Sequence, residues 1–221
     1  MNFNSIIYKV SFYNRSRKYQ LFLDQLNPND TSTILDVGFN NNDSLVENFL
    51  EKNYPYLQNI TALGIEGDNI FTTNYPEVKT VLYDGRIFPF GDKTFDIGWS
   101  NAVLEHVGGE ERQILFLKEL SRTCKQLYFT TPNRFFPFEL HTKLPLLHWL
   151  PKKMFDKILL TSEYATWATG DYMHLLSYHK IKKLLKKAGI KNYKIHRNRF
   201  CGFTMDFSII VKIHGTDLIL N

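Results

Sequence analysis

Residues 31–39 and the asparagine-rich turn after them constrain the fold of this chain more than any other stretch. Ile34, Leu35 and Val37 form a short apolar run of the kind that a buried parallel strand shows. Gly38 and residues 40–43 (Asn-Asn-Asn-Asp) then end the strand, and residues 44–50 resume at helical spacing. Strand, tight turn and helix form the opening unit of a nucleotide-binding α/β domain, in which ligands bind at the strand ends.

The turn lacks the second and third glycines that are usual in this unit, and Asn40 and Asn42 stand near their places. Asparagine is the non-glycine residue that best tolerates a positive φ, so the turn can still form. By itself the motif fits equally well a buried strand that simply ends at a turn.

Length and composition fit one globular domain. With 221 residues the chain can bury roughly 70% of its unfolded surface, enough for a sheet covered on both faces. The formal charge of +5 and the pI near 9.0 favour anionic ligands, nucleic acid or a membrane surface without choosing among them. Two cysteines give neither a disulfide framework nor metal-ligand spacing, and residues 1–17 lack an apolar signal segment. We therefore expect a cytoplasmic protein without a bound metal.

The rest of the chain alternates between strand and helix signals, which predicts a parallel, doubly wound sheet. Residues 15–26, 43–53, 110–123 and 177–188 are the predicted helices; residues 61–66, 78–83, 95–100 and 126–131 continue the strands. Two late strands, near 192–198 and 206–213, have no helix between them, so we expect an antiparallel hairpin at one sheet edge. Residues 135–175, rich in Phe, Trp, Leu and Pro, interrupt the alternation and predict an inserted cap.

Acidic residues stand where the first three strands end, at Asp36, Glu66 and Asp84. A carboxylate at the end of the second strand can accept hydrogen bonds from both hydroxyls of a ribose. Three such acids, each after an apolar strand, are much less expected by chance than one, so the pattern favours a nucleotide-like ligand.

Here the sequence resembles the class I S-adenosylmethionine-dependent methyltransferases. The resemblance rests on Asp36-Val-Gly38, Gly64-Ile-Glu66, Asp84-Gly-Arg-Ile-Phe-Pro-Phe-Gly-Asp-Lys-Thr-Phe-Asp96 and Ser100-Asn-Ala-Val-Leu-Glu-His-Val107, and covers roughly residues 31–131. It implies S-adenosylmethionine as the cofactor. Gly38 and its turn, Asn40 included, would pass the methionine part, Glu66 would bind the ribose, and Asp84 with Gly85 would meet the adenine. Asn101 to His106 would lie beside the sulfonium.

Two other functions use the same elements. An NAD-dependent enzyme needs three spaced glycines for the approach to a pyrophosphate, and this chain has only Gly38 there. A methyltransferase fold that has lost catalysis and serves as a binding or scaffolding protein is the main alternative, supported by the unusual asparagine-rich turn and the bulky Phe39.

Methyl transfer is an in-line displacement that depends on positioning, and an acidic nucleophile also needs a base. His106 is one candidate base and His141 is another. The segment after the fifth strand leaves at the carboxyl end, so Asn133, Arg134 and Glu139 could line the acceptor pocket. The plainer alternative is that Glu139 and His141 bond to local backbone and that His106 has a structural role.

The predicted cap offers a hint about the acceptor. Residues 144–151 are strongly apolar and Lys152, Lys153 and Lys157 follow, which suits a lid over an apolar acceptor, a peripheral membrane contact through residues 144–157, or a cap packed on its own domain. The lysines of residues 180–194 come without a recognisable RNA-binding module, so nucleic acid is not an expected partner.

From these observations we predict a single domain over residues 1–221, with a cap at about 132–176. Its fold class is α/β, a Rossmann-like, doubly wound, mostly parallel seven-stranded sheet with an antiparallel C-terminal hairpin. The function that the resemblance implies is S-adenosylmethionine-dependent methylation, at oxygen or nitrogen, of a small-molecule, glycan or lipid-linked acceptor.

Overall fold

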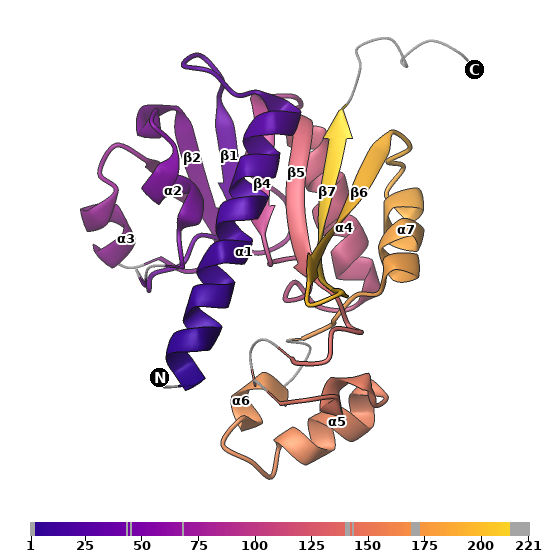
Figure 1. Cartoon of the computed structure of the whole chain (residues 1–221). Helices are drawn as coiled ribbons and strands as arrows, with labels where there is room; N and C mark the ends of the chain where they lie inside the picture. Colours follow the sequence, from indigo (N-terminus) through magenta and orange to yellow (C-terminus); the bar gives the residue numbers. More distant parts are fainter. Residues whose placement is uncertain are drawn as a thin grey trace.

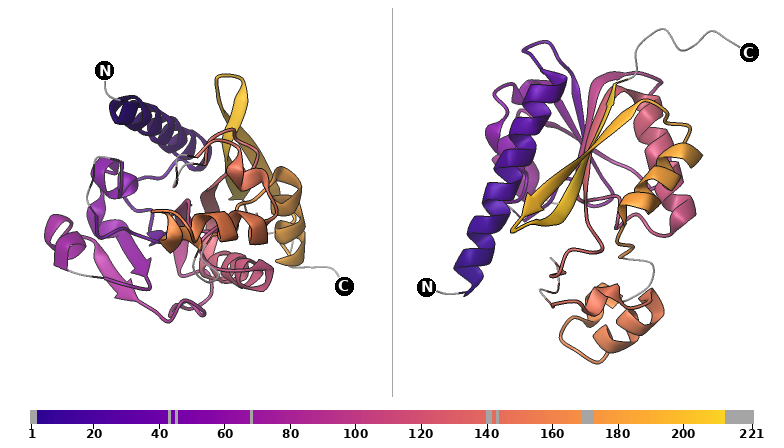
Figure 2. Two further views of the ribbon diagram at one scale, coloured as in Figure 1. Left: turned by 90° about the horizontal axis from the view of Figure 1, so that it is seen from below. Right: turned by 45° about the vertical axis from the view of Figure 1, so that its right-hand side comes forward.

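The computed structural model describes residues 3–42, 44, 46–67, 69–139, 142, 144–168 and 173–212. In this part of the chain, seven strands form one sheet in the order β3-β2-β1-β4-β5-β7-β6, with helices on both faces (Figures 1 and 2). The doubly wound α/β fold class is therefore confirmed. The chain runs outward from β1 to β3 and then returns to β4, so the strand order reverses between β1 and β4, where such sheets bind ligands.

The first five strands run parallel to one another, and β7 is antiparallel to both β5 and β6. The predicted C-terminal hairpin is thus confirmed. It turns at Cys201 and Gly202, both of which have a positive φ. The strands are β1 (Ile34–Val37), β2 (Ile60–Gly64), β3 (Lys79–Leu82), β4 (Phe95–Asn101), β5 (Cys124–Pro132), β6 (Tyr193–Phe200) and β7 (Phe203–Lys212).

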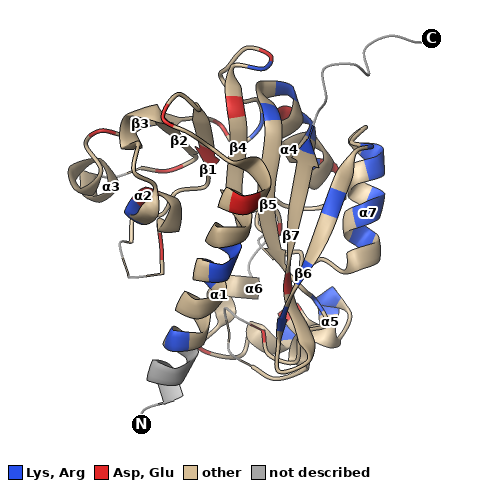
Figure 3. Ribbon diagram, turned by 45° about the horizontal axis from the view of Figure 1, so that its top comes forward, with Lys and Arg blue, Asp and Glu red and all other residues tan. Residues whose placement is uncertain are grey.

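Two hydrophobic layers hold the helices on the sheet. One face packs against α1 (Phe3–Leu26), α2 (Phe49–Asn53) and α3 (Asn69–Asn74), and the other packs against α4 (Glu110–Thr123) and α7 (Tyr178–Lys187). Lys183 and Lys187 of the basic helix α7 bond to Glu110 at the start of α4. Figure 3 shows the positive charges along α7. A short 3-10 helix, η1 (Leu57–Asn59), leads into β2.

Two helices differ in length from the sequence prediction. The first helix begins at Phe3 rather than near Arg15, and its amino-terminal part extends past the sheet (Figure 1). Phe12 and Tyr13 are exposed there, which is why an apolar stripe does not mark this part. The second helix, predicted over 43–53, begins only at Phe49, because Asn48 adopts a left-handed conformation with φ 49° and ends the loop from β1.

Residues 132–176, the cap segment, contain η2 (Leu147–Trp149), α5 (Lys152–Leu159) and α6 (Ala165–Ala168). These elements lie beyond the carboxyl end of β5 (Figure 1). Phe155, Leu159, Ala168 and Met173 form a small hydrophobic cluster of their own within this segment. None of the helices in the described part of the chain is long and apolar enough to cross a bilayer.

Candidate active site

The carboxyl ends of the parallel strands bring distant residues to one edge of the sheet. The Gly38 N–H donates to the Leu63 carbonyl at 2.9 Å, and the Tyr83 N–H donates to the Gly64 carbonyl at 3.0 Å. The Ser100 hydroxyl bonds to the Val37 carbonyl at 3.0 Å, which ties the end of β4 to the end of β1. The turn after β1 therefore lies beside the segments that follow β2, β3 and β4.

Glu66 and Asp84 are both exposed at this edge; Ile65 directly precedes Glu66, and Ile87 stands three residues after Asp84. Ile65 is 64% exposed and Ile87 is 57% exposed. Gly85 has φ 78°, and a Cβ on it would lie 3.3 Å from the Ile65 Cγ2, so the segments that follow β2 and β3 lie side by side. Carboxylates can accept hydrogen bonds from ribose hydroxyls, and aliphatic side chains can cover a flat base. The residues present therefore fit a nucleoside, and the binding roles that the resemblance implies for Glu66, Asp84 and Gly85 stay predictions.

The bulky Phe39 is accommodated in the layer between the sheet and α3. Its ring centroid lies 4.4 Å from that of Phe71, and a Cβ on Gly64 would come within 2.6 Å of its Cε1. The next residue, Asn40, is held by Asn48, whose side-chain oxygen accepts the Asn40 N–H at 2.9 Å and whose amide donates to the Asn40 carbonyl at 2.8 Å. A side-chain clamp from Asn48 thus stabilises a turn that lacks the usual glycines.

Asp36 points toward α2, where it meets Glu51. Both side chains are buried, and burial first, followed by the neighbouring Glu51 carboxyl, raises the pKa of Asp36 well above its usual range. Two carboxyl groups in such contact are stable when one proton is shared between them. The role of Asp36 in cofactor binding, inferred from the resemblance, stays a prediction; the contact that the structure shows is with Glu51.

Asn101 lies at the carboxyl end of β4 in a buried polar cluster. Its Oδ1 accepts hydrogen bonds from the Lys18 Nζ at 3.0 Å and from the Thr130 hydroxyl at 2.7 Å. Lys18 also lies 3.6 Å from Asp206, and both side chains are less than 10% exposed. Burial lowers the pKa of Lys18, and the charge of Asp206 opposes that shift. The amide of Asn101 is therefore fixed by neighbours from α1 and β5.

Aromatic packing places α1, and with it Lys18, over the ends of β4 and β5. The Phe22 ring lies 4.8 Å from that of Trp99 and 5.5 Å from that of Tyr128, and Trp99 and Tyr128 are stacked at 5.1 Å. Such aromatic pairs contribute about 0.5–1.5 kcal/mol each beyond their buried area. The Tyr128 hydroxyl donates to the Lys18 carbonyl at 2.7 Å, so the register of α1 against the sheet is defined.

His106 lies in the turn between β4 and α4, under the cap segment. Its side chain is 21% exposed, and its Nε2 lies 4.0 Å from the Glu105 carboxylate. Glu105 is fully buried and accepts the Thr131 hydroxyl at 2.9 Å. The ring of Trp167, from α6, lies 6.2 Å from that of His106. An imidazole with a carboxylate beside it and an aromatic ring near it is suited to accept a proton. His141, the other candidate base, lies outside the described residues.

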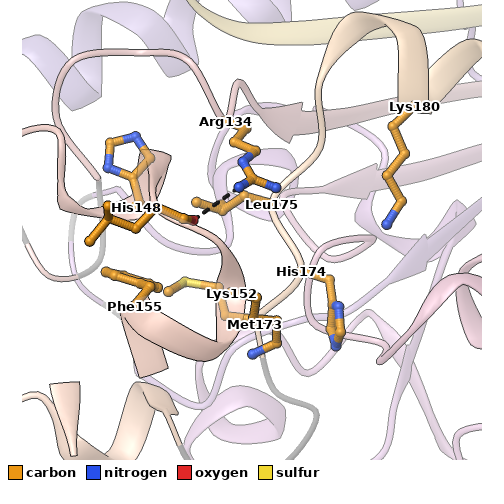
Figure 4. Close-up of a pocket in the computed structure, with 9 residues that line it drawn as sticks. Arg134, His148, Lys152, Phe155, Met173, His174, Leu175 and Lys180 are labelled. Atoms are coloured by element: carbon orange, nitrogen blue, oxygen red, sulfur yellow. Dashed lines mark hydrogen bonds between the residues drawn. The ribbon is translucent and has the colours of Figure 1, made fainter. Parts of the chain in front are cut away.

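The three predicted acceptor residues occupy different surroundings. The Asn133 amide donates to the Thr204 carbonyl at 2.8 Å, at the start of β7. Glu139 is 2% exposed and accepts the Thr142 N–H at 2.5 Å, a local backbone contact. Arg134 alone of the three lines the cavity of about 140 Å³ between the cap segment and α7 (Figure 4). Among the described residues, no group of His, Cys, Asp and Glu is placed to hold a metal ion.

Lys18, Asn48 and Trp167 belong to this site although the sequence analysis did not select them. Lys18 left a signal, because it stands four residues before Phe22 and eight before Leu26, on the apolar stripe of α1. A lysine at a core-facing position indicates a buried polar partner. Asn48 and Trp167 gave no such signal, because Asn48 contacts the backbone of Asn40 only in the folded turn and Trp167 contacts His106 from the cap segment.

Comparisons with known proteins agree with this fold. Residues 35–127 match the family described as methyltransferase domain. A SAM-dependent methyltransferase from Aquifex aeolicus superposes with a TM-score of 0.54 at 16% identity, covering 88% of this chain and 89% of that one. A possible histamine N-methyltransferase from Thermotoga maritima superposes with a TM-score of 0.60 at 14% identity, covering 94% of this chain and 92% of that one. The N-terminal domain of EvdMO1 with SAH bound superposes with a TM-score of 0.53 at 16% identity, covering 91% of this chain and 81% of that one. The search of curated proteins finds no match.

Proposed function

The chain carries a methyltransferase domain with the class I, S-adenosylmethionine-dependent fold, and from this premise we propose that it methylates an oxygen or nitrogen of a small-molecule, glycan or lipid-linked acceptor. The observation that carries the proposal is the convergence of Glu66, Asp84 and His106 on one sheet edge, next to the cap segment. Carboxylates suited to a nucleoside and a candidate base at one edge are what a methyl transfer site requires.

S-adenosylmethionine is the cofactor of this family, and it supplies a methyl group already attached to a good leaving group. Glu66 would accept the ribose hydroxyls, Asp84 and Gly85 would meet the adenine, and the turn from Gly38 to Asn40 with Asn101 would face the methionine part. Because the reaction is an in-line displacement, the contribution of these residues is to position the two reactants.

His106 is the proposed proton acceptor for the attacking group of the acceptor. The carboxylate of Glu105, 4.0 Å from its Nε2, would stabilise the imidazolium that forms, and Trp167 would limit the access of water. His141 stays a second candidate for the same role.

A binding or scaffolding protein without catalysis is the alternative, and one feature favours it. The N–H of Asn40 is already bonded to Asn48, and Val103 packs directly against Gly38, so the turn offers the methionine part of a cofactor little open backbone. The two functions differ in whether the cofactor binds.

Calorimetric titration with S-adenosylmethionine and S-adenosylhomocysteine, with NAD as a control ligand, tests the proposal. We expect micromolar binding of the sulfur ligands and a loss of about five- to 150-fold in Glu66→Ala, because a carboxylate that accepts hydroxyl hydrogen bonds contributes about 1–3 kcal/mol. Glu77→Ala is the matched control, since Glu77 is exposed just before β3, away from the carboxyl edge. The absence of binding at millimolar ligand would refute catalysis and favour the scaffold.

The cap segment supports an acceptor at a lipid surface. Met154 and Ile158 are exposed one turn apart on α5, and Lys153 and Lys157 are exposed beside them. Apolar side chains flanked by lysines suit a peripheral contact with anionic lipid. We expect sedimentation with vesicles of anionic lipid, weaker sedimentation with phosphatidylcholine alone, and a loss of binding in Ile158→Ser. The cytoplasmic location stays a prediction from cysteine usage.

A further inference from the structure

A cavity between the cap segment and α7 has a composition that the cofactor site does not explain. Its volume is about 140 Å³, and it lies between residues that follow β5, residues of the cap segment and the first turn of α7 (Figure 4). Its lining consists of Arg134, His148, Leu150, Lys152, Phe155, Met173, His174, Leu175 and Lys180. One part of this wall is cationic, and the rest consists of apolar side chains and two histidines.

The cationic part carries an excess of positive charge. Three lining residues, Arg134, Lys152 and Lys180, have cationic side chains, and among the described residues that line the cavity there is no carboxylate. Lys152 pairs with Asp156 at 2.8 Å, outside the lining. No ion pair of Arg134 or Lys180 occurs within the described part of the chain. Figure 4 shows the head groups of Arg134 and Lys180 turned toward the space between them.

Arg134 is oriented and still has an unused donor. Its Nη2 donates to the Leu150 carbonyl at 3.0 Å, which fixes the guanidinium plane. Its Nε is buried and has no hydrogen-bond partner among the described residues. A buried donor is costly unless it is paired, so a ligand that accepts hydrogen bonds would satisfy it.

We propose that this cavity binds a phosphoryl group carried by the methyl acceptor, an inference that rests on the proposed methyltransferase function. Arginine and lysine together suit this ligand, because arginine presents a planar fork of donors and lysine a compact charge. At about 140 Å³ the cavity is smaller than the roughly 300–1,000 Å³ of a typical ligand site, so it accommodates a group rather than a whole acceptor. Leu150, Phe155 and Met173 would contact an apolar part.

The electrostatics at Lys180 agree with this assignment. Burial lowers the pKa of Lys180, the charge of Glu110 opposes that shift, and the positive charges of Arg134 and Lys183 add to it. A dianion beside Lys180 would compensate for this crowding of positive charge.

The cavity also adjoins the proposed transfer site. His174 lines the cavity, and its backbone N–H donates to the Glu105 carbonyl at 2.8 Å. Glu105 directly precedes His106, the proposed base. A phosphoryl group held by Arg134 and Lys180 would therefore place the remainder of the acceptor near the sheet edge where the methyl group is transferred.

Calorimetric titration of the full chain with glucose 1-phosphate, inorganic phosphate and glucose, at constant ionic strength, tests the proposal. We expect the ester to bind at least as tightly as inorganic phosphate and glucose not to bind. Lys180→Met and Arg134→Gln should weaken the affinity for glucose 1-phosphate by about tenfold or more, as the loss of a charge-assisted hydrogen bond does. Lys186 is an exposed lysine of the same helix, and Lys186→Met should change this affinity less than twofold. If Arg134→Gln fails to fold, the affinity of Lys180→Met alone tests the proposal.

Each result has one meaning. Equal affinities in all variants, or binding of inorganic phosphate but not of the ester, would overturn the proposal. S-adenosylhomocysteine is titrated against the same proteins, and its affinity should be unchanged in the cavity variants. If S-adenosylhomocysteine fails to bind wild type, the proposed methyltransferase function is overturned. If only glucose 1-phosphate fails to bind, the proposed phosphoryl site alone is overturned.

Discussion

The buried pair of Lys18 and Asp206 links the amino-terminal helix to the site. The Lys18 Nζ lies 3.6 Å from the Asp206 carboxylate and also donates to Asn101. Asp206 accepts further hydrogen bonds from the side-chain amides of Asn14 and Asn198. We propose a double-mutant cycle with Lys18→Met, Asp206→Asn and the double variant, because Met keeps the apolar stem of the lysine and Asn keeps the shape of the carboxylate.

At 3.6 Å and an effective dielectric constant of about 20, the Coulomb energy of this pair is roughly 4–5 kcal/mol. Removing one partner leaves the other charge buried, which costs about 3–5 kcal/mol. We therefore expect Lys18→Met to lower the free energy of unfolding by about 3–5 kcal/mol. The double variant should lose clearly less than the sum of the two single losses, with a coupling energy of about 2–3 kcal/mol.

Urea denaturation at pH 7 measures these losses. Lys125→Met is the control, because Lys125 pairs with Asp96 at 2.8 Å on the surface, where the two side chains are 57% and 37% exposed. That variant should lose less than about 1 kcal/mol. Losses that add to within about 0.5 kcal/mol in the cycle would show that the pair is not coupled and would refute the reasoning.

Three further predictions concern the same sheet edge. Burial is the largest cause, and the neighbouring Glu51 carboxyl the second, that raises the pKa of Asp36 in the folded protein. The stability that the protonated Asp36 contributes is therefore present at low pH, and it is lost as the pH rises from 3.8 through the folded pKa. Asp36→Asn should therefore gain stability relative to wild type as the pH rises toward 8. A difference in urea midpoint between the two proteins that stays constant with pH would contradict this. Gly64→Ala brings a Cβ within 2.6 Å of Phe39 and should cost about 1–3 kcal/mol, much of it recovered with Phe39→Leu; a loss that Phe39→Leu leaves unchanged would point to another cause. His106→Asn should lower the turnover of an identified acceptor by about 10²–10⁴-fold with unchanged S-adenosylhomocysteine affinity, and wild-type turnover would exclude His106 as the base.

The sheet could be predicted because its signals are local. The apolar run at Ile34 to Val37 marks a buried strand in any context, and the missing helix before residues 206–213 required an antiparallel hairpin. The start of α2 could not be predicted in this way. Residues 44–50 have helical spacing, but Asn48 forms hydrogen bonds with the backbone of Asn40, a contact that exists only once the turn is folded.

The sequence by itself determined which kinds of residue stand at the strand ends, since Glu66, Asp84 and His106 follow apolar runs and parallel strands end at a common edge. Only the tertiary structure decided what those residues meet. Burial turned Asp36 toward Glu51, and α1 brought Lys18 onto Asn101. The cap segment, which follows β5, and α7, which follows the cap segment, enclosed a cationic cavity. Such contacts depend on how whole helices pack, and no local pattern in the chain encodes that.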